Sequence, residues 1–419
     1  MSEDSVSETP RPVVIGAGAA GLIACLELEQ AGQSPILLEA SDRVGGRLRT
    51  ELDEDTGFPL DHGFQVLLTA YPAAQRYLDL AALDLRVFDA GAMIRKGGRW
   101  RTVGDPRRKL SDALPTVLSG IGTMGDRLRV LRLSFELART PVESCFEGAP
   151  QTTFEYLRER GFSEGFIEDF FRPFYSGIFL EPELRTSARM FRFVFKMFAA
   201  GDVAVPGKGM QAIAEQLRGR LESTELRLGA RVRGFDSAEV RLESGETLAH
   251  AGCIVATPTL PGAEVDAAPR ESWNSCWNAI FPIAASPFSR PIIGLLPGDG
   301  IVTNLHVMGD LFGPSKGEQD RLSVTAVTPS DRAEDEVVAQ IRAELESKAG
   351  LRVPDPQRVF RIPRALPVCK EPTYAPGSAP ELRPGVFRAG DAQANPSLNA
   401  AMLSGTVAAK ALLESLTPA

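Results

Sequence analysis

The sequence has few of the residues that build metal sites or disulfide frameworks. Its 419 residues include only three histidines, His62, His250 and His306, which lack the spacing of metal ligands. The five cysteines are scattered, odd in number and without a Cys-x-x-Cys pair. We therefore predict no metal site and a reduced, cytoplasmic location.

Long apolar runs and blocks of basic residues are also missing. No run approaches the roughly 20 apolar residues that cross a bilayer. Residues 1–10 are polar and acidic, which predicts a flexible tail and not a signal peptide. With a net charge of −8 and no Lys/Arg block, a nucleic-acid partner is not expected. The length exceeds what one core usually organises, so we expect two domains or one domain with large insertions.

The first fifty residues have the pattern of a dinucleotide-binding βαβ unit. Residues 12–15 and 35–38 predict strands, and residues 19–31 predict the helix between them. Glu39 ends the second strand, where its carboxylate accepts the two ribose hydroxyls and repels the 2′-phosphate of NADP.

The turn before the predicted helix reads Gly16-Ala17-Gly18-Ala19-Ala20-Gly21. The first glycine permits the tight turn, the second lets the backbone approach a pyrophosphate, and the third lets helix and strand pack closely. The orphan N–H groups at the helix start then hold the phosphate charge. Residues 120–125 repeat the glycine pattern without a preceding strand, so we predict a helix–helix turn there.

Later segments alternate between helical and strand patterns. Long amphipathic helices are predicted over residues 107–139 and 154–198, and shorter helices over residues 333–349 and 397–416. Strands are predicted over residues 226–233, 239–242, 254–256, 291–296, 322–327 and 385–388. This interleaving predicts a nucleotide-binding domain of residues 11–71, 205–273 and 380–419, and a substrate domain of residues 72–204 and 274–379.

Two further runs favour FAD over NAD. The first reads Glu39-Ala40-Ser41-Asp42-Arg43-Val44-Gly45-Gly46-Arg47. Its two glycines and two arginines supply close backbone approach and charge pairing beside a pyrophosphate. A surface loop with solvated arginines is the alternative interpretation.

The second run lies near the end of the sequence and reads Gly390-Asp391, then Pro396-Ser397-Leu398-Asn399. Asp391 is placed to bond the ribityl or phosphate region of a flavin nucleotide. The helix start after Asn399 is placed to stabilise negative charge at the pyrimidine edge of the ring. A capped terminal helix is the alternative.

Together these runs resemble the flavin-containing amine oxidase superfamily, which includes phytoene and related polyene desaturases, protoporphyrinogen oxidases and monoamine oxidases. The terminal match extends through Met402 to Gly405. Residues 205–211 resemble the family's proline–glycine–methionine turn, Arg231-Val232 the strand whose backbone meets adenine, and residues 253–258 the strand that returns to the flavin. The resemblance implies an α/β fold, with a Rossmann-like FAD-binding domain built from three chain segments and an inserted α+β substrate domain.

The run Asp61-His62-Gly63-Phe64-Gln65 resembles the loop that lies against the flavin ring in this family. The resemblance implies that Gly63 and Phe64 contact the ring. His62 is then a candidate proton shuttle and Gln65 a candidate orienting donor. A turn histidine with a purely structural role is the alternative for His62.

Some amine oxidases bind flavin covalently through a cysteine upstream of the terminal motif. Cys369 begins a segment that loosely resembles that region, but residues 364–367 before it predict an ordinary loop. We therefore expect FAD to be bound non-covalently.

The substrate is less clearly indicated than the cofactor. Residues 392–395 contain no aromatic residue where monoamine oxidases carry one, and Tyr374 is the nearest candidate. Ten of the 22 phenylalanines fall between Phe162 and Phe198. They predict a tunnel for a long apolar substrate, a membrane-facing patch with Arg172, Arg189 and Arg192, or plain core packing.

We accordingly predict an FAD-dependent oxidoreductase that takes a hydride equivalent from an apolar polyene- or porphyrinogen-like molecule. Oxygen or a quinone would accept the electrons, and peripheral membrane contact is compatible with such a substrate. An amine oxidase and a flavin-binding protein without catalysis remain the alternatives.

Overall fold

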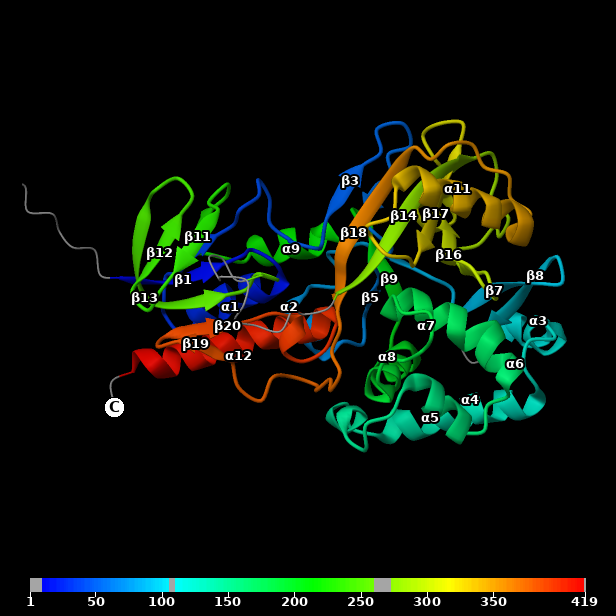
Figure 1. Ribbon diagram of the computed structural model, residues 1–419, viewed down its shortest axis with the longest axis horizontal. Helices are drawn as coiled ribbons and strands as arrows, with labels where there is room; N and C mark the ends of the chain where they lie inside the picture. Colours follow the sequence, from blue (N-terminus) through cyan, green and yellow to red (C-terminus); the bar gives the residue numbers. More distant parts are fainter. Residues whose placement is uncertain (1–9, 105–109, 260–272, 418–419) are drawn as a thin grey trace, which may run out of the picture.

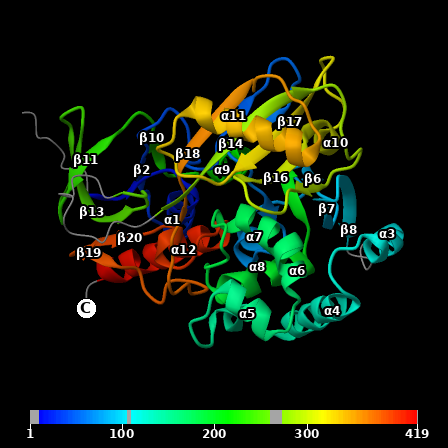
Figure 2. The same ribbon diagram turned by 45° about the vertical axis from the view of Figure 1, so that its right-hand side comes forward.

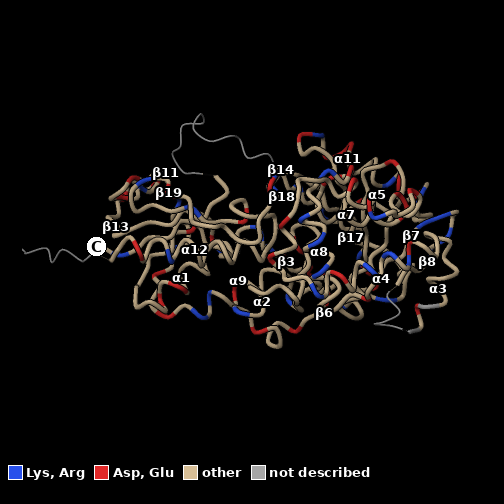
Figure 3. The backbone as a smooth tube through the Cα atoms, turned by 90° about the horizontal axis from the view of Figure 1, so that it is seen from below, with Lys and Arg blue, Asp and Glu red and all other residues tan. Residues whose placement is uncertain are grey.

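The protein contains two large β-sheets at opposite ends of an elongated molecule, with a group of helices beside the second sheet (Figure 1). The computed structural model describes residues 10–104, 110–259 and 273–417. The predicted tail, residues 1–10, lies almost wholly outside these ranges. Basic and acidic residues are interspersed along the backbone of both halves (Figure 3).

The first sheet draws its strands from three separate segments of the chain. In spatial order they are β10 (Glu225–Arg227), β2 (Ile36–Leu38), β1 (Arg11–Ile15), β13 (Thr247–Val255), β12 (Glu239–Leu242) and β11 (Val232–Phe235). β13 also pairs with β20 (Val386–Arg388), whose other neighbour is β19 (Glu381–Arg383). The pairings of β1 with β2 and β13, and of β13 with β20, are parallel.

Helices α1 (Ala19–Gln30) and α12 (Leu398–Leu416) pack on one face of this sheet (Figure 1). Successive β1 side chains point to opposite faces, so Val14 joins the core with α1 and α12, whereas Val13 and Ile15 join a smaller core on the other face. The two helices approach closely, because a Cβ on Gly405 would collide with the Ala20 carbonyl oxygen.

The second sheet has seven strands and is antiparallel except where β15 meets β7. In spatial order the strands are β18 (Arg358–Pro367), β14 (Trp273–Ile283), β17 (Asp320–Ala326), β16 (Val302–Val307), β15 (Ile293–Leu295), β7 (Gly91–Lys96) and β8 (Arg99–Gly104). The short helix α10 (Met308–Phe312) follows β16. Helix α11 (Glu334–Glu344) continues into a π-helical turn and covers one face through Val337 and Ile341.

Two small sheets lie between the large ones. One is the hairpin of β3 (Thr50–Leu52) and β4 (Pro59–Asp61), and the other joins β5 (Leu67–Leu68), β9 (Val203–Pro206) and β6 (Leu85–Val87). The helices near them are α2 (Pro72–Tyr77) and α9 (Gln211–Arg218). The hydroxyl of Tyr77 contacts Thr406, so α2 packs on α12.

The helical group beside the second sheet is formed by α3 (Ala113–Leu118), α4 (Met124–Arg139), α5 (Thr153–Glu159), α6 (Glu164–Phe166), α7 (Arg172–Phe179) and α8 (Ala188–Ala200). Figure 2 shows α3 and α4 at its outer edge. The phenylalanines between Phe162 and Phe198 are buried or half-buried members of one core. Of the three interpretations, core packing therefore holds for this segment.

The arginines of the Phe-rich segment are also held within the helical group. Arg172 donates to Glu168, Arg189 to the Gly148 carbonyl, and Arg192 to the Ser144 and Glu147 carbonyls. They do not form a membrane-facing patch with the phenylalanines. None of the helices in the described part of the chain is long and apolar enough to span a bilayer.

Several sequence predictions of secondary structure are wrong in their bounds. The predicted helix over residues 107–139 breaks at Gly120 and Gly122, whose φ angles are +69° and +67°. This break confirms the helix–helix turn at the second glycine motif. The predicted helix over residues 154–198 also breaks, since Leu180 ends α7 with a φ of +53°.

The predicted strand over residues 226–233 is two strands, β10 and β11. Gly229 lies between them with a φ of +69°, and its N–H donates to the Ser41 carbonyl (2.8 Å). The sequence did not predict strands β3, β4, β5, β6, β7, β8, β9, β14, β16, β18 and β19. Residues 364–367, predicted as a loop, are the end of β18.

Candidate functional site

The glycine turn between β1 and α1 leaves its backbone open to a ligand. The Gly16 N–H donates to the Leu38 carbonyl (2.7 Å), with a φ of +101° that favours glycine. A Cβ on Gly21 would collide with the Gly16 carbonyl oxygen, whereas a Cβ on Gly18 would meet no atom within 4 Å. No side chain caps α1 at Gly18 and no acid lies in its first turn, so the N–H groups around Ala19 and Ala20 suit an anion.

Glu39 lies beside this turn and links it to the start of β11. Its carboxylate accepts hydrogen bonds from the Ala17 N–H (2.8 Å) and the Ser41 N–H (2.9 Å). The backbone carbonyl of Glu39, which precedes Ala40, accepts the Ala230 N–H (2.8 Å). This hydrogen bond brings the segment before Val232 close to the end of β2. The Ser41 hydroxyl also donates to the carboxylate oxygen that accepts the Ser41 N–H (2.9 Å), so the oxygen that faces Ala17 is the one with a lone pair left for a ribose hydroxyl.

The Gly45-Gly46 loop packs edge to edge on the glycine turn. The Gly45 N–H donates to the Ala17 carbonyl (2.8 Å), and both glycines have positive φ, +116° and +58°. Arg43 donates to the carbonyls of Leu48 (3.2 Å) and Gly46 (3.0 Å). Arg43 therefore stabilises this loop. The sequence pattern alone did not distinguish this role from pairing with a phosphate.

Arg47 joins the first segment of the chain to the last. Its guanidinium donates to the Asp391 carboxylate (2.5 Å), 344 residues away, and to the Ala365 carbonyl (3.0 Å) at the end of β18. It also lies 5.4 Å from the ring centroid of Trp273. Asp391 is buried. One side chain thus holds together the two runs that the sequence assigned to the same cofactor.

The terminal segment turns into α12 beneath this ion pair. Gly390, with a φ of +134°, donates its N–H to the Ser404 hydroxyl (2.8 Å). Ser397 caps the helix by accepting the Ala400 N–H (3.0 Å). The side-chain amide oxygen of Asn399 accepts the Ala73 N–H (3.0 Å). Asn399 and Met402 are fully buried and Leu398 is half-buried.

The loop after β4 lines a small cavity between the two halves of the molecule. The cavity holds about 20 Å³, enough for one water. The end of β4 contributes Asp61, and the loop contributes Gly63, Phe64 and Gln65. The facing wall contributes residues of the second sheet and α10, among them Ile280, His306, Met308 and Leu311. The structure therefore places part of the expected flavin-facing loop at a cavity with a mostly apolar opposite wall.

His62 is not among the residues that line this cavity. Its Nε2 lies 2.6 Å from a Glu51 carboxylate oxygen, and its ring stacks on Phe360 with centroids 4.2 Å apart. Burial lowers the pKa of His62 below its ordinary value. Gln65 donates to the carbonyls of Arg47 (3.0 Å) and His62 (3.3 Å). These contacts favour a structural role for His62.

Two titratable cavity residues were not singled out from the sequence. His306 lies on β16, a strand that was not predicted, with its ring centroid 4.9 Å from that of Phe64. Burial lowers the pKa of His306 to about 4. Burial raises the pKa of Asp61 to about 6, although the Thr50 hydroxyl (2.5 Å) and the Met210 N–H (2.9 Å) donate to its carboxylate. Only the Asp-His-Gly run offered a sequence signal for Asp61.

Tyr374, the nearest aromatic candidate from the sequence, lies in the terminal segment. Its ring centroid is 6.2 Å from that of Phe146 and 6.4 Å from that of Phe193. Burial raises its pKa, and a side-chain contact with Asn399 opposes the shift. Tyr374 is not among the residues that line the cavity.

Solved structures share this fold over nearly the whole chain. A protein from Exiguobacterium sp. 255-15, provisionally named a protoporphyrinogen oxidase, has a TM-score of 0.69 at 18% identity and covers 97% of this chain and 99% of its own. Putrescine oxidase bound to putrescine has a TM-score of 0.65 at 16% identity, with coverages of 97% and 99%. Reduced UDP-galactopyranose mutase has a TM-score of 0.65 at 17% identity, with coverages of 97% and 96%.

Curated relatives match over shorter stretches. L-amino-acid oxidase of Demansia vestigiata is 40% identical over 82 residues, 20% of this chain and 16% of the relative. The 15-cis-phytoene desaturase of Arabidopsis thaliana is 34% identical over 128 residues, 28% of this chain and 22% of the relative. The matches thus span about a fifth of these relatives' length. The model of the family "Flavin containing amine oxidoreductase" matches residues 19–413, so the chain belongs to that family.

Proposed function

We propose that the protein is an FAD-dependent oxidoreductase that removes a hydride equivalent from an apolar small molecule of the polyene or porphyrinogen class. Oxygen or a quinone would accept the electrons. FAD supplies the redox chemistry when bound, and the protein binds it, orients the substrate and excludes water. The observation that carries the proposal is the Arg47–Asp391 ion pair, which joins the first chain segment, with its uncapped helix N-terminus, to the terminal segment.

The residues around this ion pair fit an extended dinucleotide. The turn from Gly16 to Gly21 suits the pyrophosphate, since its backbone is open and its helix start is positive. Glu39 suits the ribose, and the backbone at Val232 suits the adenine. Arg47 and Asp391 would meet the phosphates and the ribityl chain. The residues nearest the flavin ring would be Gly63, Phe64, Ser397, Leu398, Asn399 and Met402.

An apolar substrate is favoured by the wall that faces Phe64. Ile280, Met308 and Leu311 on that wall carry no polar side-chain group that could bind a charged molecule. His306 is neutral at any pH well above 4, since burial lowers its pKa to about 4. Such a wall orients a hydrocarbon by shape and excludes water from it.

An amine oxidase is the second candidate, and Asp61 is the observation that favours it. With a pKa raised to about 6 by burial, its carboxylate is charged at neutral pH and could attract an ammonium group. Two donors already use one carboxylate oxygen. A panel of amines tested for peroxide release separates the two candidates from each other.

We also propose that residues 11–71, 205–273 and 380–419 form the FAD domain, and that residues 72–204 and 274–379 form the substrate domain. The segregation of the two large sheets supports this division. The active site would lie at the junction. All five cysteines are free, which supports a reduced, cytoplasmic location.

The first experiment is a visible absorption spectrum of the purified protein before and after denaturation. We expect a flavin spectrum that shifts to that of free FAD on unfolding. A colourless protein that FAD cannot reconstitute would contradict the proposal. Acid precipitation checks the mode of attachment: colour in the supernatant indicates non-covalent FAD, whereas colour in the pellet indicates a covalent link, with Cys369 as the candidate.

Substrate candidates are then added without oxygen, and bleaching of the flavin absorbance reports hydride removal. We expect polyenes or porphyrinogens to bleach it, and simple amines to leave it unchanged. Photoreduced flavin that stays reduced with oxygen and with quinones would indicate a flavin-binding protein without catalysis.

A further inference from the structure

Helices α3 and α4 expose an unusual number of large apolar side chains. Seven of the eleven such side chains in the described residues lie here: Leu114, Val117, Leu118, Met124, Leu128, Leu131 and Phe135. We call these seven residues the apolar patch. Leu128 and Phe135 are 64% and 62% exposed. Scattered exposed leucines need no explanation, but a contiguous set of this kind marks a contact surface.

The helical spacing places the α4 members on one face. Residues 124, 128, 131 and 135 follow each other at intervals of four, three and four, which is one stripe of an α-helix. The opposite face is already used, because Leu133 and Leu137 are buried in the protein core. The helix therefore has two apolar faces, and of these only the face with Leu133 and Leu137 is buried among the described residues.

The two helices form one surface. Arg127 of α4 donates to the carbonyls of Thr116 (2.9 Å) and Val117 (3.2 Å) in α3. Helices α3 and α4 lie at the outer edge of the helical group, at the opposite end of the molecule from α12 (Figures 1 and 2).

The charge around the patch is basic, although the whole chain carries −8. Arg132 and Arg139 are exposed on α4 beside the stripe, and the Arg139 guanidinium lies over the ring of Phe135. Arg129 is turned further from the stripe and lies 4.0 Å from the Asp126 carboxylate. The two acids of α4 are already engaged. Asp126 is buried in the capping box at the helix start, and Glu136 forms a two-pronged ion pair with Arg160 (2.6 Å for each bond).

This combination distinguishes between two occupants of the patch. In a symmetric dimer the same surface meets itself, which would bring two basic borders, each with Arg132 and Arg139, into one interface. In an anionic bilayer, the acyl chains would surround the apolar stripe, and the negatively charged headgroups would attract the arginines beside it. We propose that the apolar patch docks the protein on the surface of an anionic lipid bilayer, with α4 lying in the plane of the interface. This proposal does not depend on the redox reaction.

Vesicle co-sedimentation tests the proposal with the full-length protein. Phosphatidylcholine vesicles are compared with vesicles that also contain phosphatidylglycerol. We expect binding to the mixed vesicles that weakens as salt is raised. A fully immersed Leu or Phe contributes roughly tenfold or more to the partition coefficient. The double variant Leu128→Gln/Phe135→Gln should therefore bind at least about 100-fold more weakly.

Two control variants make the result specific. Leu52 on β3 is 68% exposed and lies outside the patch, so Leu52→Gln should bind like the wild type. Arg132→Gln should lose about fivefold on the mixed vesicles only. Circular dichroism and the thermal unfolding midpoint check that each variant is folded, which is expected because the substituted side chains are exposed.

Three outcomes would overturn the proposal. They are no sedimentation with either kind of vesicle, equal binding by the wild type and the Leu128→Gln/Phe135→Gln variant, and a concentration-dependent dimer that only the patch variant abolishes. The last outcome would assign the surface to a second copy of the chain. None of these readouts requires bound flavin or turnover, so failure here is distinct from failure of the proposed oxidoreductase.

Discussion

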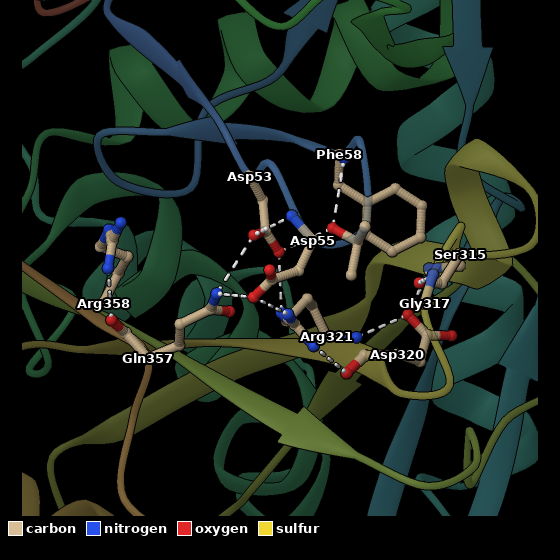
Figure 4. A network of polar contacts seen from close by, with 11 residues as sticks. Asp53, Asp55, Phe58, Ser315, Gly317, Asp320, Arg321, Gln357 and Arg358 are labelled. Atoms are coloured by element: carbon tan, nitrogen blue, oxygen red, sulfur yellow. Dashed lines mark hydrogen bonds and ion pairs between the residues drawn. The ribbon is translucent and has the colours of Figure 1, made fainter.

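A buried ion pair that joins the β3–β4 turn to the second sheet gives the sharpest stability prediction. Arg321 on β17 donates to the Asp53 carboxylate (2.9 Å), and their side chains are 5% and 3% exposed (Figure 4). Asp53 also accepts hydrogen bonds from Thr56 (2.6 Å) and Gln357 (3.1 Å). The Asp55 N–H donates to it as well (3.3 Å), so four donors surround the carboxylate and Arg321 is the one that carries a charge.

Arg321→Met removes the charge and leaves Asp53 buried. Breaking a buried pair by removing one partner costs about 3–5 kcal/mol of unfolding free energy. Since Thr56 and Gln357 still donate to the carboxylate, we expect the lower end, about 3 kcal/mol. Burial raises the pKa of Asp53, but the Thr56 hydrogen bond and the Arg321 charge outweigh it and hold the pKa below its ordinary value. This stabilisation is present above the unfolded-state pKa and is lost as pH falls through the folded-state pKa, so the cost of Arg321→Met should shrink in acid.

The assay is guanidinium unfolding followed by tryptophan fluorescence and by flavin release, because a chain of this size need not unfold in one step. Arg352→Met is the matched control, since Arg352 pairs with Glu346 (2.7 Å) at side-chain exposures of 87% and 53%. That exposed pair should contribute less than about 0.5 kcal/mol. If the two variants shift the unfolding midpoint equally, the reasoning about burial is wrong. In the double variant Asp53→Asn/Arg321→Met, the two costs should be clearly less than additive.

Two further substitutions test the site itself. Gly21→Ala should abolish flavin binding, because its Cβ would collide with the Gly16 carbonyl oxygen. The flavin absorbance of the purified variant measures this loss. The control Gly219→Ala, whose Cβ would lie 3.4 Å from the nearest atom, the Glu215 carbonyl oxygen, should retain its flavin absorbance. Asp61→Asn retains the acceptor for Thr50 but removes a carboxyl whose pKa burial raises to about 6. Because a raised pKa favours the folded state below it, the stability of the wild type relative to Asp61→Asn should fall as pH rises from about 4 to about 6, as thermal unfolding at several pH values would reveal. A relative stability that stays constant over this range would contradict the assigned environment.

The sequence predicted elements well where local chemistry decides them. The helix after the glycine turn was predicted over residues 19–31 and is α1 (Ala19–Gln30), because the turn and the glycine that ends the helix are both local signals. The predictions failed where a break depends on surroundings. Leu180 adopts a positive φ that no residue preference indicates, and Gly229 turns toward Ser41 of a distant segment. The missed strands belong mainly to the second sheet and to the two small sheets. Every residue of β16 is buried, so its apolar alternation is weak, and β3, β4, β5 and β6 have only two or three residues each.

The candidate site required more than local patterns, because it depends on which strands become neighbours. β13 pairs in parallel with both β1 and β20, with Ile15 opposite Val255 and Val255 opposite Arg388. The carboxyl ends of the three strands therefore coincide, and each chain leaves the sheet at the same edge. In open parallel sheets, ligands bind at such an edge where the chain connections diverge. This register brings the segment after β20, with Asp391, close to the loop that carries Arg47. The sequence alone does not give the pairing of these strands, so it did not predict the contact between the two residues.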